Sequence, residues 1–278
     1  MRCSPSTAPI RPGGRSGCAL WSETSMLRDR LPLVTAAELR SAFRKVGLDS
    51  GGTVYAAASL AGLAAMADPA PVVLDALRAT VGPLGTIVMP SFHPGFRYEG
   101  LFDPDQTPSR SGILSEHFRT RPGTVRTWAP PFNPVCVEGP GAGGLSAISS
   151  PTAFGPGSVF DRLVEIDATV LLIGCSFHDG VSHVHWLEER HDVPYRTWRE
   201  ISGQVVLNGK TITRGWPCHI RRPGVELHAG VVGEQLAAAG AIRQVDTGLT
   251  RISAFSLQDF AAVLDPWFGR NRECMVLL

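Results

Sequence analysis

Hydrophobic and polar positions along the chain follow two periods, one typical of amphipathic helices and one of buried strands. A helix is predicted from Thr35, because Thr35 and Glu38 form a Thr-x-x-Glu capping box before a one-sided apolar pattern. A strand over 53–57, a helix after Asp68 and a strand over 86–89 follow. Strand, helix and strand within about forty residues is typical of a parallel crossover unit. The pattern therefore predicts an α/β fold.

The rest of the chain continues this alternation without a fixed repeat period. A polar, Pro-rich loop is expected over 91–111, and a flexible Gly-rich connection over 139–144. Asn208-Gly209 lies between two β-rich runs and predicts a hairpin at an edge or lid. The other predicted elements are helices over 112–119, 160–163, from about 182, 225–239 and 256–264, and strands over 124–127, 169–173 and 242–245.

Composition narrows the class of protein. The chain has 278 residues, 44% of them hydrophobic, which supplies enough apolar material for one large core or two modest ones. A net charge of +1 gives no basic field for nucleic acid, so no nucleic-acid partner is expected. No apolar run reaches the roughly eighteen residues of a membrane span. The six cysteines show no C-x-x-C pair, which favours free thiols and a cytoplasmic protein.

The first 25 residues are rich in Pro, Ser, Gly and Arg and lack a regular apolar period. They also lack the apolar segment of a secretory signal. We therefore interpret residues 1–25 as a disordered tail, with Met26 as an alternative start, and residues 26–278 as one α/β domain.

The segment 174–189 carries the most chemistry, because a polar cluster follows a predicted buried strand. Loops beyond the carboxyl ends of such strands line ligand crevices in open α/β sheets. On a helix beginning near residue 182, His185 would share a face with Glu188 and Glu189. A paired carboxylate would fix the imidazole tautomer, and histidine is suited to take a proton from an attacking amine. Spacing alone favours this catalytic role no more than it favours histidines without a function at a loop and a helix start.

Two other types of chemistry have candidate residues in this segment. His183 and His185, with His178 or Asp179, would offer zinc ligands. Residues two apart on a helix point to different sides, so no metal is expected. Cys175 directly follows the strand, but nothing beside it in the sequence indicates a reactive thiol, and we expect a structural residue.

Four stretches of the chain resemble one known family, the aminoglycoside 3-N-acetyltransferases. They are GPLGTIVMPS (82–91), FDPDQTPSRSGILSEHFR (102–119), FGPGSVFDRL (154–163) and the segment 178–188, which contains an Asp, a Ser and a His followed three residues later by Glu. The likeness extends from about Thr35 to Pro266. It implies a mixed central sheet flanked by helices, unlike the GNAT acetyltransferases, with a small β-hairpin extension. It also implies acyl transfer from acetyl-CoA to an amine of an aminoglycoside-like or polyamine substrate, in antibiotic resistance or biosynthesis.

The resemblance also assigns roles to individual residues. The catalytic set would be His185 as general base, Glu188 as the carboxylate beside it, Ser182 as a hydroxyl near the reacting carbonyl, and Asp179 in the polar loop. Acetyl-CoA binding falls to Ser59, Leu60, Ser91, Gly155, Gly157 and Ser158. Substrate binding falls to Asp103, Glu116, His178 and His183.

The chain departs from the family pattern in two loops, where Ala57 and Ala129 replace usual histidines. Fewer polar groups there weaken the case for acetyl-CoA. Two alternatives therefore stay open. One is an enzyme of natural-product biosynthesis that uses the same base with another acyl donor or in ring closure, without CoA. The other is a non-catalytic partner of an active paralogue, and a homodimer or a heterodimer with a related protein is a possible assembly.

Overall fold

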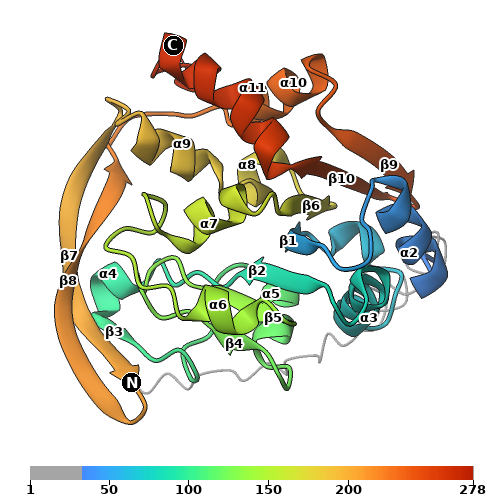
Figure 1. Cartoon of the computed structure of the whole chain (residues 1–278), viewed down its shortest axis with the longest axis horizontal. Coiled ribbons are helices and arrows are strands. Elements are labelled where there is room, and N and C mark those ends of the chain that lie inside the picture. The colour runs from blue at the N-terminus through green and yellow to red at the C-terminus, as the bar shows by residue number, and fades with distance from the viewer. Residues whose placement is uncertain (1–32, 278) are drawn as a thin grey trace, which may run out of the picture.

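The computed structural model describes residues 33–277 (Figure 1). The predicted tail over 1–25 and the alternative start at Met26 lie outside the described residues. Within 33–277, no helix is both long and apolar enough to cross a membrane. The prediction of a single domain over 26–278 stays a prediction.

A mixed seven-stranded sheet forms the centre of the molecule, in the order β4-β5-β2-β1-β6-β10-β9. Its middle consists of three parallel strands, β2 (Thr86–Pro90), β1 (Thr53–Ala58) and β6 (Thr169–Ile173). Antiparallel strands extend it on both sides: β4 (Val125–Arg126) and β5 (Val135–Glu138) beside β2, and β10 (Thr250–Ser256) and β9 (Arg243–Thr247) beside β6. The predicted α/β fold with a mixed sheet is confirmed, although the sequence pattern missed β5 and β10.

The first helix begins where its capping box predicts. The backbone N–H of Glu38 donates to the Thr35 side chain at 3.2 Å, and the Thr35 N–H donates to the Glu38 carboxylate at 2.8 Å. The helices and short helical turns are α2 (Ala36–Lys45), η1 (Ala61–Leu63), α3 (Pro69–Val81), α4 (Phe96–Glu99), α5 (Ile113–Arg119), α6 (Ala142–Ser146), α7 (Val159–Glu165), α8 (Phe177–Gly180), α9 (Val184–Arg190), α10 (Gly230–Ala238) and α11 (Leu257–Arg270).

Three predicted segments differ from the structure. The helix expected over 225–239 begins only at Gly230, because Leu227 forms a β-bridge with Val276 and the His228 N–H donates to the Met275 carbonyl. The connection over 139–144 contains the start of α6, and the loop over 91–111 contains α4 and the short strand β3 (Leu101–Phe102).

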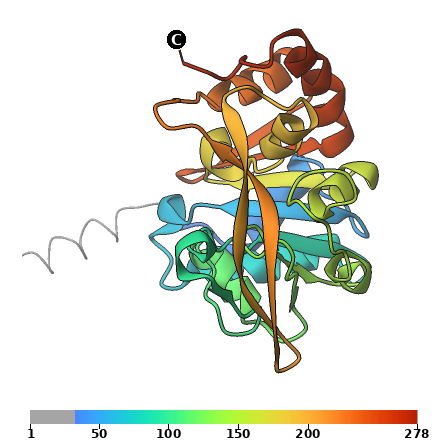
Figure 2. The same cartoon turned by 90° about the vertical axis from the view of Figure 1, so that its left-hand side faces the viewer.

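A second, three-stranded sheet lies along one side of the molecule in the order β3-β7-β8. Strands β7 (Arg196–Leu207) and β8 (Lys210–Arg221) pair over 12 residues each, so the hairpin is much longer than the small extension expected. Its turn has positive φ at Asn208 and Gly209, as the Asn-Gly pair favours. Figures 1 and 2 show the hairpin as a long ribbon along one side of the molecule, running from the end of α9 past α4 and β3.

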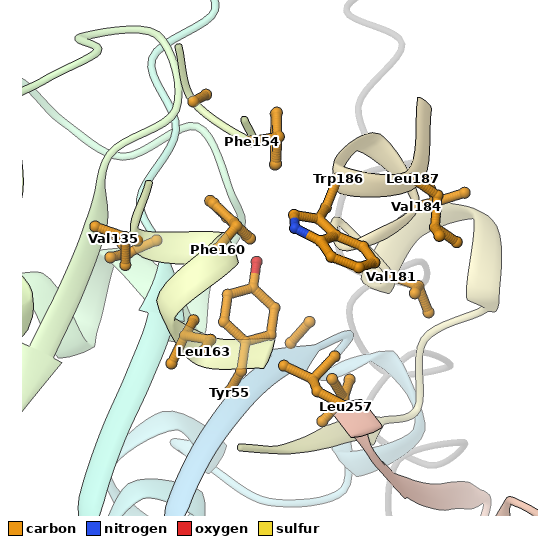
Figure 3. Packing of buried hydrophobic residues seen from close by; sticks show 14 of the residues in the cluster. Tyr55, Val135, Phe154, Phe160, Leu163, Val181, Val184, Trp186, Leu187 and Leu257 are labelled. Carbon is orange, nitrogen blue, oxygen red and sulfur yellow. The ribbon is translucent and has the colours of Figure 1, made fainter. Parts of the chain in front are cut away.

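Two apolar cores cover the two faces of the central sheet. Along β1, Tyr55 belongs to one core and Val54 and Ala56 to the other, as the two-residue period of a strand requires. Figure 3 shows Tyr55 projecting toward Phe160 of α7, with Trp186 of α9 nearby. The Trp186 indole N–H donates to Asp161 at 2.8 Å, which ties α9 to α7. This packing fixes the start of α9 beside the sheet.

Candidate active site

A cleft of about 530 Å³ opens between the segment that follows β6 and the β7–β8 hairpin. Helices α8 and α9 form one wall, and β8 residues 218–221 form the other. Phe132 and Phe154, from two separate loops, close it further. The cleft lies beyond the carboxyl end of β6, where ligands bind in open α/β sheets. Its volume is that of a small-molecule site.

His185 lines this cleft and contacts the buried carboxylate of Glu188. Its Nδ1 lies 2.5 Å from Oε2 of Glu188, one helical turn further along α9. The His185 side chain is 36% exposed, whereas that of Glu188 is 1% exposed. Phe154 packs against the imidazole edge with ring centroids 5.1 Å apart. The imidazole is therefore reached from the cleft while its carboxylate partner is shielded from water.

Arg196, at the start of β7, completes the cluster. Its Nε lies 2.8 Å from Oε2 of Glu188, and its Nη1 donates to the His219 carbonyl at 3.0 Å. Burial opposes ionisation of Glu188, but His185 and Arg196 outweigh it and lower the pKa of Glu188 to about 2. Glu188 is thus a carboxylate at neutral pH, held between a guanidinium and an imidazole.

The tautomer of His185 follows from these contacts. Nδ1 is 2.5 Å from the Glu188 carboxylate and 3.1 Å from Nη2 of Arg196. A carboxylate only accepts hydrogen bonds, so the shorter contact requires a proton on Nδ1. In the neutral ring, Nε2 then carries the lone pair. The arrangement therefore provides a proton acceptor.

Ser182 lines the same cleft, on the turn just before α9. Its Oγ accepts a hydrogen bond from the Tyr55 hydroxyl at 3.0 Å. Burial raises the pKa of Tyr55, so the phenol keeps its proton and remains the donor. The Ser182 hydroxyl hydrogen is then available to a ligand.

Five of the expected site residues line the cleft: Asp179, Ser182, His185, Glu188 and His178. Asp179 also accepts from the Ser176 hydroxyl at 2.7 Å within the cap of α8. The structure thus brings together the whole catalytic set that the resemblance implies, and one of the four residues expected to bind substrate.

The other expected residues lie elsewhere. Glu116 accepts from Arg119 on its own helix, and Asp103 accepts from backbone N–H groups of the turn that follows it. Ser158 caps α7 by accepting from the Asp161 N–H at 3.1 Å. None of the residues expected to bind acetyl-CoA lines this cleft: Ser59, Leu60, Ser91, Gly155, Gly157 and Ser158.

His183 is the largest departure from expectation. The side chain is fully buried, edge-on to Tyr55 and Phe160 at centroid distances of 4.9 and 5.0 Å. Neither ring nitrogen has a hydrogen-bond partner. Burial lowers its pKa to about 3, so the ring is neutral. His183 does not line the cleft. Its buried position therefore gives no support to the expected contact with substrate.

These positions also bear on the other chemistries. Because His183 points into the core and His185 into the cleft, the two do not converge on one ion. Over residues 33–277, no three His, Cys, Asp or Glu side chains gather as metal ligands. Burial raises the pKa of the Cys175 thiol to about 11, which agrees with the expected structural role.

Sequence reasoning missed Arg196 and His219 as parts of the site. Glu189 lines the cleft, and burial raises its pKa to about 7. The His219 ring stacks on Trp198 at 4.5 Å. Arg196 and His219 come from the hairpin, whose position beside α9 no local pattern shows. Glu189 was expected on the helix face of His185 and as one of the acids that attract a cationic substrate.

Comparison with known proteins adds independent findings. A family model described as aminoglycoside 3-N-acetyltransferase matches residues 56–269. Aminoglycoside N(3)-acetyltransferase IV of Salmonella sp is 33% identical over 185 residues, which cover 63% of this chain and 66% of that protein, slightly under two thirds.

Solved structures show the same fold. A mutant of AAC(3)-IVa in complex with a gentamicin superposes with a TM-score of 0.74 at 26% identity, covering 88% of this chain and 92% of that one. A binary complex of AAC-IIIb with CoASH gives a TM-score of 0.75 at 23% identity, covering 86% and 97%.

Proposed function

Because the chain belongs to the aminoglycoside 3-N-acetyltransferase family, we propose that it transfers an acyl group from a CoA thioester to an amine of a small molecule, with His185 as the general base. An aminoglycoside-like or polyamine acceptor fits the names of the relatives. The observation that supports the proposal is the contact of His185 Nδ1 with buried Glu188, which leaves Nε2 as the proton acceptor in the cleft.

The residues of the cleft divide the reaction between them. A CoA thioester, when bound, supplies an activated acyl group and a thiolate leaving group. Nε2 of His185 takes the proton that the amine nitrogen gives up as it bonds to the acyl carbon. Glu188 stabilises the imidazolium that results, because it is already ionised and hydrogen-bonded to Nδ1. The imidazolium can then return the proton to the departing sulfur.

Ser182 is suited to a second task. Tyr55 donates to its Oγ, so the serine hydroxyl hydrogen can turn to a carbonyl oxygen that gains negative charge. A donor held in place before the reaction costs little reorganisation when the charge develops. His185 and Ser182 would thus act on the nitrogen and the oxygen of the same reacting pair.

A steady-state assay tests the proposal. Full-length protein is mixed with acetyl-CoA and either gentamicin or spermidine, and release of the CoA thiol is followed. His185→Ala is expected to lower kcat by about 10² to 10⁴, the usual contribution of a general base. His117→Ala, outside the cleft, is the matched control and keeps the wild-type rate. Turnover by His185→Ala at the control rate would contradict the assignment.

One observation favours a second candidate function. The six residues expected to bind acetyl-CoA do not line the cleft, and Ala57 and Ala129 are buried without polar side chains. The same base would then serve another acyl donor, or ring closure within one substrate. Titration calorimetry with CoA separates the two candidates: binding supports the first, and its absence together with consumption of an amine substrate supports the second.

A further inference from the structure

Phe154, which contacts His185, lies on a loop outside the regular elements. This loop, residues 152–155, comes shortly before α7 and contains no helix or strand. The Phe154 ring packs against Phe160 of α7 at a centroid distance of 4.5 Å and against the His185 imidazole at 5.1 Å. Figure 3 shows Phe154 near Phe160 and Trp186. The base of the proposed function therefore has an aromatic neighbour whose position depends on the 152–155 loop.

Glu189 of α9 contacts the same loop. A methyl group added to Gly155 would stand 3.0 Å from Oε2 of Glu189 and 2.5 Å from Oγ1 of Thr152, so both side chains lie directly against the loop backbone. Thr152 Oγ1 accepts a hydrogen bond from the Gly155 N–H at 3.0 Å. The threonine hydroxyl hydrogen then points elsewhere, and the Glu189 carboxylate accepts from Thr152 and from the Phe154 N–H. Glu189 thus joins α9 to the loop at two points.

The protonation of Glu189 agrees with a role as hydrogen-bond acceptor. Burial raises its pKa to about 7, so at neutral pH the carboxylate is ionised in only part of the molecules. Its attraction for a cation is then incomplete, whereas at least one of its oxygens accepts hydrogen bonds in either protonation state. The contacts with the loop therefore do not depend on a full negative charge.

We propose that Glu189 is a positioning residue, which holds the 152–155 loop so that Phe154 packs against His185 and keeps the imidazole in contact with Glu188. The proposal rests on the proposed function, because it takes His185 as the base. The χ2 torsion of histidine is broad and roughly two-fold, so neighbouring groups decide the orientation of the ring. A fixed aromatic neighbour restricts that rotation. If the loop moves away, the imidazole can turn, and Nε2 no longer points at the reacting amine.

A direct contact with substrate is the alternative role for Glu189, because its side chain also lines the cleft. Thr152 does not line the cleft, although it shares the loop contact with Glu189. Thr152→Val removes the hydroxyl and keeps the branched shape of the side chain. A change in turnover caused by Thr152→Val therefore reports the position of the loop, and not a lost contact with a ligand.

Steady-state turnover of acetyl-CoA and gentamicin by the full chain is the first measurement. Glu189→Ala is expected to lower kcat by about 10- to 100-fold while the KM of gentamicin changes by less than about 3-fold, because a misplaced base affects the transition state more than substrate binding. Thr152→Val is expected to lower kcat in the same way, by a smaller factor. Thr213→Val, exposed on β8 and outside the cleft lining, is the matched control and keeps the wild-type rate.

A double-mutant cycle shows whether Glu189 acts through Phe154. Phe154→Leu removes the aromatic ring beside the imidazole and keeps an apolar side chain in its place. If Glu189 acts only by holding Phe154, adding Glu189→Ala to Phe154→Leu lowers kcat by less than about 2-fold further. Two effects on kcat that multiply in the double variant would show independent roles and overturn the inference.

Two kinetic results would also overturn the inference. One is a higher KM of gentamicin with an unchanged kcat in Glu189→Ala, which would assign the carboxylate to substrate binding. The other is a wild-type kcat in Thr152→Val. Because this second variant loses only a hydroxyl group, it keeps the test decisive if Glu189→Ala does not fold.

Nitrogen-15 NMR of the imidazoles, recorded without substrates, separates this inference from the proposed function. The His185 signals are assigned by their loss in His185→Ala. They are expected to move in Glu189→Ala and Thr152→Val and to stay unchanged in Thr213→Val. If they move in this way but the wild type acylates no amine, the function fails and the positioning role stands. Acylation by the wild type with unchanged His185 signals in Glu189→Ala would uphold the function and overturn the inference.

Discussion

His183 and His185 stand two residues apart, yet they belong to different environments. His183 packs among Tyr55, Phe160 and Phe260 with no hydrogen-bond partner for either nitrogen. His185 contacts a buried carboxylate and faces the cleft. Surroundings, and not residue type, decide which imidazole can exchange a proton. His183 is a packed side chain of the core, and His185 is the imidazole that faces the cleft.

The largest expected loss of unfolding free energy comes from replacing Glu188, the carboxylate that contacts His185. Glu188→Ala leaves Arg196 buried without its counter-ion, which costs about 3–5 kcal/mol of unfolding free energy. Glu165→Ala breaks an ion pair whose partners are 52% and 56% exposed and is expected to cost about 0–1 kcal/mol. Urea unfolding measures the free energy of unfolding of both variants and of the wild type. If the two variants were equally stable, Glu188 would not be the buried partner described here.

The next effect concerns His183, the buried histidine, and the pH dependence of the unfolding free energy. The folded-state pKa of His183, about 3, lies below its ordinary value of 6.5. Its neutral form therefore stabilises the fold fully above pH 6.5, and this stabilisation declines as pH falls from 6.5 toward 3, by up to about 1.4 kcal/mol per pH unit. His183→Phe is expected to abolish that decline while acyl transfer stays within a few-fold of wild type.

Unfolding measured at pH 7 and pH 5 tests this point. Wild type should lose about 2 kcal/mol more than His183→Phe over that interval. Glu188 does not interfere there, because its stabilising ionisation is lost only as pH falls from 4.5 toward 2. Identical pH dependence in the two proteins would show that His183 is hydrated or paired, contrary to the structure.

The smallest expected effect concerns the hydrogen bond from Tyr55 to Ser182, which links the core to the cleft. Tyr55 belongs to the core, but its hydroxyl donates to Ser182 in the cleft. Tyr55→Phe removes one hydrogen bond and is expected to cost about 1 kcal/mol in unfolding free energy, with a modest fall in kcat. A loss as large as that of Glu188→Ala would mean that Tyr55 does more than position Ser182.

The sequence was sufficient where interactions are local. The Thr35 capping box, the parallel β1–α3–β2 unit and the spacing of His185 and Glu188 all involve neighbours in the chain, and the structure has each of them. The resemblance assigns Ser158 and Glu116 to binding, and each contacts a partner three residues away, so their binding roles stay predictions. Arg196 depends on the placement of a hairpin across from α9, which no residue spacing reveals.

The protonation of His185 is the point on which the account depends. Nitrogen-15 NMR of the full chain with labelled histidines, at neutral pH, reports which ring nitrogen carries the proton. The proposed base requires a proton on Nδ1, shared with Glu188, and a lone pair on Nε2. A proton on Nε2 with a bare Nδ1, which would then accept from Arg196, would contradict the proposed base.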